Sequence, residues 1–456
     1  MTESTSPSSV DVAVLGGGAG GALVACHLLA RGARVALVEA RPHPALGVAY
    51  STPYGEHLLN VNAARMSAFA SVPGDFVAWL QTQPEGAGRD AATLGPWFAP
   101  RRLYGRYLQT RLDAHALQAK LIRHTDTAVD AVQAAGGWRV TLASGATLQA
   151  RAVVLATGNA PAVLPDEAAM PGIIDAWDYA AIAAIPVDAR VCIIGAGLSM
   201  VDVLLTLDAR GHRAHVFALS RNGLMPLAHA PGTRPQAGEV EPMMALGVRG
   251  RMRLLRRWAA EAEAGGRPWQ DALERLRPHV RALWQAWPPV EQRRFLRHAV
   301  RLWDIHRHRI APEVAGVIER MIETGHVVLH AGRLTRITPC ASGFQVEWTP
   351  RRAAASTEQV DVLVNAAGME KRLLRTPNAL LRALHARQLI TPGPHGLGIA
   401  TGGDGEVQDG EGRVVSGLWT LGATRLGDLW ETIAIPELRD QAERVADGLL
   451  RSCDPR

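Results

Sequence analysis

The chain has 456 residues, of which 47% are hydrophobic and 20% are charged. This composition is typical of a globular protein with a large core, so a wholly disordered or collagen-like chain is excluded. The formal net charge of +6 is concentrated in one region, because residues 249–309 carry 15 arginines against 6 acidic side chains. No apolar run reaches the roughly 18 residues that a membrane-spanning helix needs, so we expect no membrane segment.

The four cysteines stand apart in the sequence and form no CxxC pair. This spacing argues against a dithiol reductase, a structural zinc site and a disulfide framework. We therefore expect no metal site and a cytoplasmic location. Residues 1–9 lack the basic-then-apolar order of a secretory signal and are expected to form a disordered tail.

In chain order, the first predicted elements form a strand–turn–helix–strand unit. An apolar run at 10–15 precedes the glycines of 16–21, a helical pattern follows, and 34–38 reads as a second strand. A similar unit occupies 190–220. Such units predict parallel sheets, so the expected fold is α/β with two Rossmann-like dinucleotide-binding domains of three layers.

A β-meander is predicted after each of these units. The meanders cover 124–156 and 327–368, and they close in the small-residue turns ATG at 156–158 and AAG at 366–368. Between them, residues 240–325 read as Arg-rich helices that form an insertion. Five tryptophans at near-helical spacings are expected in its core rather than on a nucleic-acid-binding surface: Trp258, Trp269, Trp284, Trp287 and Trp303.

The first glycine motif is Gly16-x-Gly18-x-x-Gly21, and Glu39 follows at the end of the next strand. The glycines permit a tight turn and a close approach of pyrophosphate to the helix N-terminus, while the acid accepts hydrogen bonds from an adenosine ribose. The residues of the predicted site are Gly16, Gly18, Ala19, Gly20, Gly21 and Glu39, with Gly158 in the ATG turn.

The second motif holds Gly195, Gly197 and Ser199, with Met200 where a third glycine would stand. Met200 is expected to push the helix slightly away from the strand. Ser220 and Arg221 end the following strand in place of an acid, and an arginine there can accommodate a 2′-phosphate. This favours NADPH over NADH, although Arg221 could equally be a solvated strand-end residue.

One cofactor in each domain indicates FAD in the first and a nicotinamide coenzyme in the second. The FAD-binding domain is predicted at 10–185 with 327–456, and the NAD(P)H-binding domain at 186–326, which includes the helical insertion at 240–325. No nucleic acid is expected as a partner, and the sequence leaves the oligomeric state open.

Three segments are candidates for the flavin ring or the substrate. The loop Gly422–Gly427 and the residues Glu431, Thr432 and Ile433, which precede a helix that contains Pro436, could offer backbone N–H groups to the pyrimidine edge of the flavin. In the polar segment 57–66, Asn60, Asn62 and Arg65 could hold the ring or the substrate, or they could only tie down a loop.

The third segment is the basic cluster at 298–309. Its members could bind a coenzyme phosphate or an anionic substrate, or they could form a solvated helix face. They are His298, Arg301, His306, Arg307, His308 and Arg309, of which Arg307 is the candidate catalytic residue.

Several motifs resemble bacterial FAD–NAD(P)-binding proteins of the FAD-dependent oxidoreductase type. They are LGVAYSTPYGEHLLNVNAARM at 46–66, RRLYGRYL at 101–108, GAGLSMVD at 195–202, SRNGLMPLAH at 220–229, WDIHRHRIAP at 303–312 and LWETIAIPELRDQA at 429–442. More distantly, the chain resembles N-hydroxylating and other class B flavin monooxygenases. No FxGxxxHxxxW-type signature follows the ATG turn, so Baeyer–Villiger chemistry is disfavoured.

One branch of this family is an FAD-dependent urate hydroxylase. The resemblance therefore implies that urate is oxidised to 5-hydroxyisourate with NAD(P)H and O2, and that the protein serves purine catabolism. Three alternatives stay open: an N-hydroxylating amine monooxygenase, an NAD(P)H-dependent flavin reductase, and a non-enzymatic flavin redox sensor that uses the Arg-rich insertion.

Overall fold

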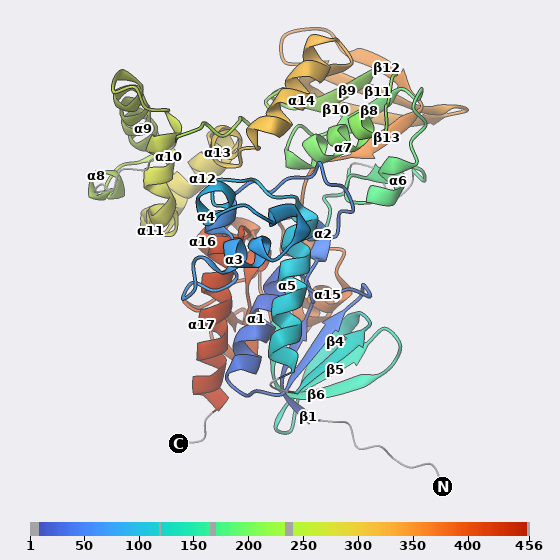
Figure 1. Cartoon of the computed structure of the whole chain (residues 1–456). Coiled ribbons are helices and arrows are strands. Elements are labelled where there is room, and N and C mark those ends of the chain that lie inside the picture. Colours follow the sequence, from blue (N-terminus) through green and yellow to red (C-terminus); the bar gives the residue numbers. More distant parts are fainter. Residues whose placement is uncertain (1–8, 118–119, 165–169, 233–239, 454–456) are drawn as a thin grey trace. The chain divides into compact units, whose positions relative to one another are not determined.

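The computed structural model describes residues 9–117, 120–164, 170–232 and 240–453 (Figure 1). The predicted disordered tail at 1–9 lies outside these ranges, except for Ser9, with which the first strand begins. The chain divides into two compact units. Unit 1 comprises Met1–Thr52, Val61–Ala160 and Glu370–Arg456, and unit 2 comprises Pro53–Asn60 and Pro161–Met369.

Unit 1 is built on an eight-stranded sheet whose main path runs β14-β15-β6-β1-β2-β3, with β4 and β5 attached to β6. Its strands are β1 (Ser9–Leu15), β2 (Val35–Glu39), β3 (Leu121–Thr125), β4 (Ala128–Ala134), β5 (Gly137–Leu142), β6 (Thr147–Leu155), β14 (Glu406–Gln408) and β15 (Val414–Thr420). The pairs from β15 to β3 are parallel, and β4, β5 and β6 form the predicted antiparallel meander.

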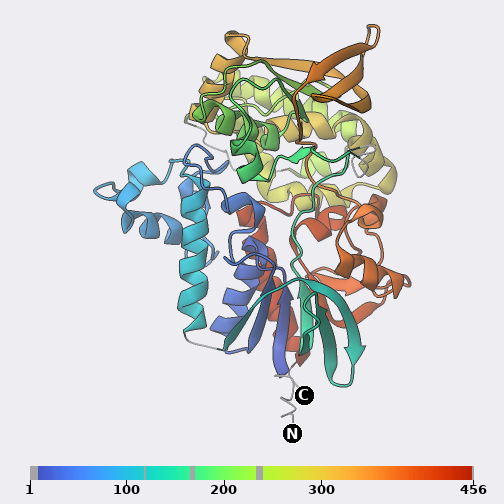
Figure 2. The same ribbon diagram turned by 90° about the vertical axis from the view of Figure 1, so that its right-hand side faces the viewer.

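Helices cover both faces of this sheet. The helices of unit 1 are α1 (Ala19–Ala30), α2 (Gly47–Tyr50), α3 (Asp75–Gln81), α4 (Ala91–Leu94), α5 (Arg101–Ala116), α15 (Ala379–Ala386), α16 (Leu426–Leu429) and α17 (Ile435–Cys453). The helices α17, α1 and α5 run side by side as one layer (Figures 1 and 2), and α15 packs on β4. The sequence patterns predicted α1 and α17 but assigned no helix to 47–116.

Residue choice explains the central strands. β1 is buried at Ala13, Val14 and Leu15, and β2 is buried along Val35–Val38, as expected for parallel strands that are covered on both faces. One hydrophobic cluster contains residues of β1 and β2 together with Trp138 of the meander, which is 2% exposed. The α1 helix is buried almost all round because it lies between the sheet and its neighbours α5 and α17.

Unit 2 contains a seven-stranded sheet in the order β12-β11-β10-β9-β8-β13-β7. The strands are β7 (Ile174–Asp175), β8 (Val191–Ile194), β9 (Val216–Ser220), β10 (Val327–Cys340), β11 (Gly343–Pro350), β12 (Ser356–Val360) and β13 (Val362–Asn365). The strands from β10 to β7 are parallel, and β10, β11 and β12 form the second predicted meander.

The helices of unit 2 are α6 (Tyr179–Ala183), α7 (Leu198–Ala209), α8 (Glu241–Met244), α9 (Val248–Ala264), α10 (Gln270–Leu276), α11 (Val280–Ala286), α12 (Pro289–His298), α13 (Val300–Arg307) and α14 (Pro312–Glu323). The α9 helix ends at the glycine pair Gly265-Gly266. Between α10 and α11 the helical pattern is interrupted by a short 3-10 turn that contains Pro278, because proline removes a helical N–H donor.

The α14 helix corrects the extent of the insertion. It was predicted as part of the Arg-rich helices at 240–325, but it packs against α7 and β10 and thus forms the crossover between β9 and β10. The insertion proper is α8–α13. Its core contains Leu254, Leu273 and Leu283, against which Trp258, Trp269 and Trp303 pack, so the expected core role of these tryptophans is confirmed.

The compact units divide the chain at positions that differ from the predicted boundaries. The predicted FAD-binding domain included 161–185 and 327–369, whereas both segments belong to unit 2. The reason is strand pairing, because β10 pairs with β9, β13 pairs with β8, and β7 pairs with β13. No helix in the described ranges is long and apolar enough to cross a membrane.

Candidate functional site: two dinucleotide-binding turns

The first glycine turn of unit 1 links β1 to α1. Gly16 has φ +108°, and a Cβ built there would lie 2.2 Å from the carbonyl oxygen of Ala156. A Cβ on Gly21 would lie 1.9 Å from the carbonyl oxygen of Gly16. Both positions therefore require glycine, because no side chain fits between the turn and its surroundings.

The N-terminus of α1 is left open by this turn. Gly18 is the N-cap, and no side chain caps the helix. The first N–H groups of a helix have no partner within the helix and attract anions. The turn therefore fits the pyrophosphate of FAD, for which Gly18, Ala19 and Gly20 offer backbone N–H groups without bulky side chains.

Glu39 has a structural task in addition to the predicted one. Its Oε2 accepts a hydrogen bond of 2.7 Å from the N–H of Gly17, and its Oε1 accepts one of 3.1 Å from the N–H of Arg41. The carboxylate therefore holds the glycine turn in place. Each carboxylate oxygen can accept a further hydrogen bond, so a contact from Glu39 to the adenosine ribose stays a prediction.

The segment after β2 crosses the glycine turn. The N–H of Ala45 donates to the carbonyl oxygen of Gly17 over 2.6 Å. Gly47 has φ +53°, and its added Cβ would lie 3.3 Å from the Cα of Gly18. Gly47 thus belongs to the surroundings of the glycine turn, although it was not among the predicted site residues. A glycine in the segment that follows the acidic residue is the signal that could have indicated this close backbone approach.

The second glycine turn, in unit 2, repeats the same construction. Gly195 has φ +124°, and its added Cβ would lie 2.1 Å from the carbonyl oxygen of Ala366. Thus each first glycine rests on the first residue of a small-residue turn, Ala156 in ATG and Ala366 in AAG. Met200 is fully buried, and α7 still begins directly after Gly197 without a side-chain cap.

The polar residues around this second turn are partly engaged. The Oγ of Ser199 accepts a hydrogen bond of 3.2 Å from Trp177 Nε1. The Oγ of Ser220 accepts one of 3.1 Å from the N–H of Gly223, so its own O–H can still donate. Arg221 is exposed and has no ion pair within the parts of the chain that the structure describes.

The C-terminal loop of unit 1 differs from the prediction at Gly422. Its N–H was expected to face the flavin, but it donates to Gln441 Oε1 over 3.0 Å. Gln441 Nε2 in turn donates to the carbonyl oxygen of Thr432 over 3.0 Å. The glutamine ties the loop to α17, and Gly422 N–H is therefore not available to a ligand.

The residues before α17 are held in a strained conformation. Trp430 has φ +65°, which is an unfavourable region for a bulky side chain. Thr432 is 1% exposed and Ile433 is 40% exposed, so only the second of these side chains faces solvent. Contacts of Glu431, Thr432 and Ile433 with the flavin stay predictions.

The polar segment 57–66 is divided between the two units. Asn60 belongs to unit 2, whereas Asn62 and Arg65 belong to unit 1. The Oδ1 of Asn62 is buried and has no hydrogen-bond partner among the described residues, while Arg65 is exposed. His57 is fully buried, and its Nε2 lies 3.0 Å from the carbonyl oxygen of Asp202. This histidine therefore anchors the segment on α7.

A buried network lies under the insertion of unit 2. The Arg309 side chain is 1% exposed, and its Nη2 forms an ion pair with Oε1 of Glu274. Its Nε donates to Nδ1 of His229 over 3.3 Å, and the Nε2 of His229 donates to the carbonyl oxygen of Asn60 over 2.9 Å. Burial, and then the charge of Arg309, lowers the pKa of His229 to about 4, so this imidazole is neutral.

The predicted basic cluster at 298–309 is thus not one surface. Arg309 and Arg307 are buried, whereas His298 is exposed. The ring of His306 packs edge-on against Trp269 at 5.1 Å between centroids. Arg301 reaches the glycine turn before α7, because its Nη2 donates to the carbonyl oxygen of Ala196 over 2.8 Å.

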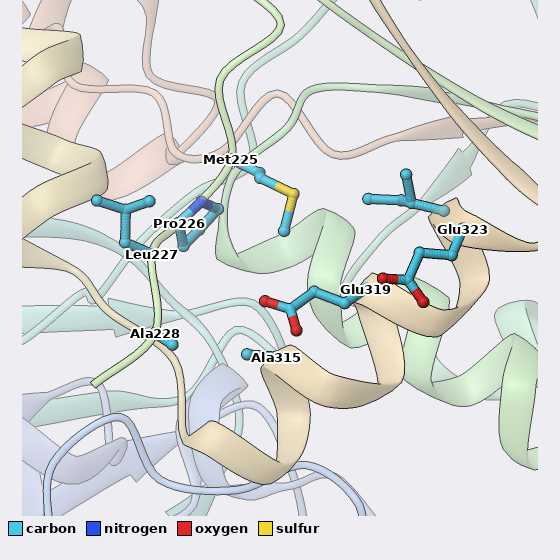
Figure 3. A pocket seen from close by; sticks show the side chains of 8 residues that line it. Met225, Pro226, Leu227, Ala228, Ala315, Glu319 and Glu323 are labelled. Atoms are coloured by element: carbon cyan, nitrogen blue, oxygen red, sulfur yellow. The ribbon is translucent and has the colours of Figure 1, made fainter. Parts of the chain in front are cut away.

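An open pocket of about 380 Å³ lies in unit 2 between α14 and the segment that follows β9 (Figure 3). Glu319 and Glu323 face it from α14, and Met225 faces it from the opposite segment. None of the residues predicted as site residues lines this pocket. It is therefore separate from both glycine turns.

Comparison with known proteins agrees with this construction. A family model described as FAD-NAD(P)-binding matches residues 13–160, which hold the first glycine turn and the ATG turn. No curated protein sequence matches the chain.

Solved structures match over nearly the full length. An ornithine hydroxylase from Pseudomonas aeruginosa has 17% identity and a TM-score of 0.69, with 98% of this chain and 100% of that chain covered. An ornithine N-hydroxylase from Kutzneria sp. 744 has 14% identity and a TM-score of 0.67, with 97% and 99% covered. The cadaverine monooxygenase of Erwinia amylovora, solved with FAD, has 14% identity and a TM-score of 0.66, with 98% and 95% covered.

At these identities the solved structures show the fold. The prediction of two Rossmann-like domains is confirmed, and the family model confirms the prediction of FAD and NAD(P)H as cofactors. The chain therefore has the two-domain fold of FAD- and NAD(P)-binding flavoproteins.

Proposed function

We propose that the protein is an FAD-dependent monooxygenase that uses NAD(P)H and O2 to hydroxylate the nitrogen of a small primary amine. The observation that carries this proposal is the likeness in fold to two ornithine hydroxylases and a cadaverine monooxygenase, which extends over 97–98% of this chain. N-hydroxylation of an amine, which the sequence left open as an alternative, thus becomes the main proposal.

The reaction balances as follows: a primary amine, O2, NAD(P)H and a proton give a hydroxylamine, water and NAD(P)+. FAD, when bound, supplies the transfer of two electrons from NAD(P)H to O2 and of one oxygen atom to the amine. The chain itself supplies binding and orientation. The open N-terminus of α1 takes the FAD pyrophosphate, and the turn before α7 takes the coenzyme pyrophosphate.

The cysteines support an oxygenase over a thiol reductase. Cys26 and Cys192 are buried, and burial raises the pKa of Cys26 to about 12 and that of Cys192 above its ordinary value. A redox-active thiol must be accessible and form a thiolate. Cys340, on β10, is exposed, and no CxxC pair exists in the sequence.

Urate is the competing substrate, because the sequence resemblance implies it. The basic cluster at 298–309 was a candidate site for an anionic substrate, and urate is an anion at neutral pH. Arg309 is instead paired with Glu274 inside unit 2. Breaking a buried ion pair costs about 3–5 kcal/mol, so Arg309 is a poor partner for a substrate. An amine is the first substrate to test, because the solved structures of similar fold include two ornithine hydroxylases and a cadaverine monooxygenase.

The test is a substrate panel with the FAD-loaded protein. NADPH oxidation and O2 consumption are measured with ornithine, lysine, cadaverine and urate, and products are analysed by mass spectrometry for the gain of one oxygen atom. We expect one amine to stimulate NADPH oxidation and to be converted to its hydroxylamine. The Gly18→Val variant, which is designed to lose FAD, controls for flavin-independent oxidation.

Other results would identify the alternatives. Stimulation by urate alone would favour urate hydroxylation, and NADPH oxidation without any oxygenated product would favour a flavin reductase. Bound FAD without NADPH oxidation would favour a redox sensor. A cytoplasmic location stays a prediction, which cell fractionation would test.

A further inference from the structure

Arg301 joins two loops that are far apart in the sequence. It lies on α13 of the insertion, and its Nη2 donates to the carbonyl oxygen of Ala196 over 2.8 Å and also to that of Leu224. Ala196 stands between the two glycines of the second turn. Leu224 stands in the loop that follows β9. One guanidinium thus bridges the loops at the ends of β8 and β9.

These two loops enclose one part of a dinucleotide site. In Rossmann folds the glycine turn after the first strand holds the pyrophosphate, and the end of the second strand recognises the 2′ position of the adenosine ribose. Here β8 and β9 are the first and second strands, and they are paired in parallel. Arg301 therefore lies where the adenosine half of a nicotinamide coenzyme binds.

Two charged side chains, Asp304 and Arg221, act on Arg301. Burial lowers the pKa of Arg301, the charge of Asp304 raises it, and the charge of Arg221 lowers it again. Neither arginine forms an ion pair within the described ranges of the chain. The N–H donors on Nε and Nη1 of Arg301 likewise have no partner there. Two guanidinium groups that act on each other and form no ion pair favour a bound anion.

We propose that Arg301 and Arg221 together bind the 2′-phosphate of NADPH, so that a residue of the helical insertion determines the coenzyme preference. The O–H of Ser220 completes the site as a third donor, because its oxygen already accepts from Gly223. This inference rests on the proposed use of NAD(P)H. It adds a specificity-determining residue, Arg301, that lies 80 residues beyond Arg221 at the end of the strand that normally supplies such a residue.

A purely structural role of Arg301 predicts a different result. If the side chain only fastens the insertion to the sheet, its loss weakens the binding of all adenosine ligands alike, or it lowers the stability of the fold without changing the preference between ligands. If it binds the 2′-phosphate, its loss weakens only ligands that carry that group. The comparison of two ligands that differ in this one phosphate separates the two roles.

The experiment measures binding by calorimetry to the FAD-loaded protein. The probes are adenosine 2′,5′-bisphosphate and adenosine 5′-monophosphate. The variants are Arg301→Gln, which removes the charge, and Arg301→Lys, which keeps the charge but loses the fork of donors. The matched control is Arg297→Gln, an exposed arginine of α12 in the same insertion. FAD content and melting temperature are recorded for each variant.

We expect Arg301→Gln to weaken the binding of the bisphosphate at least tenfold, which is typical of a lost charge-assisted contact. The affinity for the monophosphate should change less than twofold. Arg301→Lys is expected to show a smaller loss in the same direction, and it serves as the deciding variant if Arg301→Gln does not fold. Equal losses for both probes, or no loss for either, would overturn the inference.

The outcome is independent of the proposed reaction, because binding needs neither amine nor O2. If the wild-type protein prefers the bisphosphate through Arg301 but hydroxylates no amine, the proposed function fails and this inference stands. If amines are hydroxylated and Arg301→Gln leaves the preference for the bisphosphate intact, the inference fails and the function stands.

Discussion

The first glycine turn gives a sharp test of FAD binding through the substitution Gly18→Val. Gly18 has φ −67° and ψ −168°, which any residue adopts, and the nearest atom to an added Cβ is the Cα of Gly47 at 3.4 Å. The backbone therefore accepts a side chain. The valine methyl groups, however, would fill the approach of the pyrophosphate to the N-terminus of α1.

The expected loss follows from the contacts that the methyl groups prevent. Two charge-assisted hydrogen bonds from the first turn are worth about 1.5–3 kcal/mol each. Their loss weakens FAD binding by about 3–6 kcal/mol, which is roughly 10²–10⁴-fold. Purified protein should be colourless, and titration of the apoprotein with FAD measures the affinity.

A matched control separates this effect from damage to the fold. Gly74 is the N-cap of α3 in the same unit, with φ −86° and no atom within 4 Å of an added Cβ. Gly74→Val should therefore keep one FAD per chain. The reasoning is refuted if Gly18→Val binds FAD as tightly as the wild type, or if both variants lose the flavin to the same extent.

Three further outcomes are expected. Arg221→Ala should raise the Michaelis constant for NADPH at least tenfold and leave that for NADH almost unchanged, since one charge-assisted contact is worth about 1.5–3 kcal/mol. Steady-state kinetics with both coenzymes tests this, and an equal rise of both Michaelis constants would contradict it. Glu274→Gln should destabilise the protein by about 3–5 kcal/mol, because the charge of Arg309 is left buried without its partner, while the exposed Glu319→Gln should leave the melting temperature unchanged. As the pH is lowered from 6.5 to about 4, the free energy of unfolding should decrease, because His229 binds a proton in the unfolded chain but not in the folded protein. Melting curves of a His229→Gln variant at different pH values should lack this contribution.

Local patterns were sufficient to predict the two glycine turns. A strand, a glycine-rich turn and a helix follow one another within about 30 residues of sequence, so the pattern contains its own context. The small-residue turns ATG and AAG were predicted as matching features. In the structure, the carbonyl oxygens of Ala156 and Ala366 in these turns lie against Gly16 and Gly195, the first glycines of the two motifs.

Contacts between distant residues were not predictable in the same way. Arg301 meets Ala196 across 105 positions of the sequence, and Gln441 meets Gly422 across 19 positions. No periodicity or motif encodes such pairs. For the same reason the basic cluster at 298–309 was treated as one surface, although Arg309 is buried with Glu274 and Arg301 reaches the glycine turn.

The His229 network explains why the resemblance did not determine the substrate. Three of the segments that carried it meet there: Asn60 from 46–66, His229 from 220–229 and Arg309 from 303–312. They contact one another, and Arg309 is also paired with Glu274, inside unit 2. Residues that hold a unit together serve any substrate, so such motifs indicate a shared architecture and not a shared reaction. The choice between an amine and urate therefore depends on other residues, and the substrate panel addresses it directly.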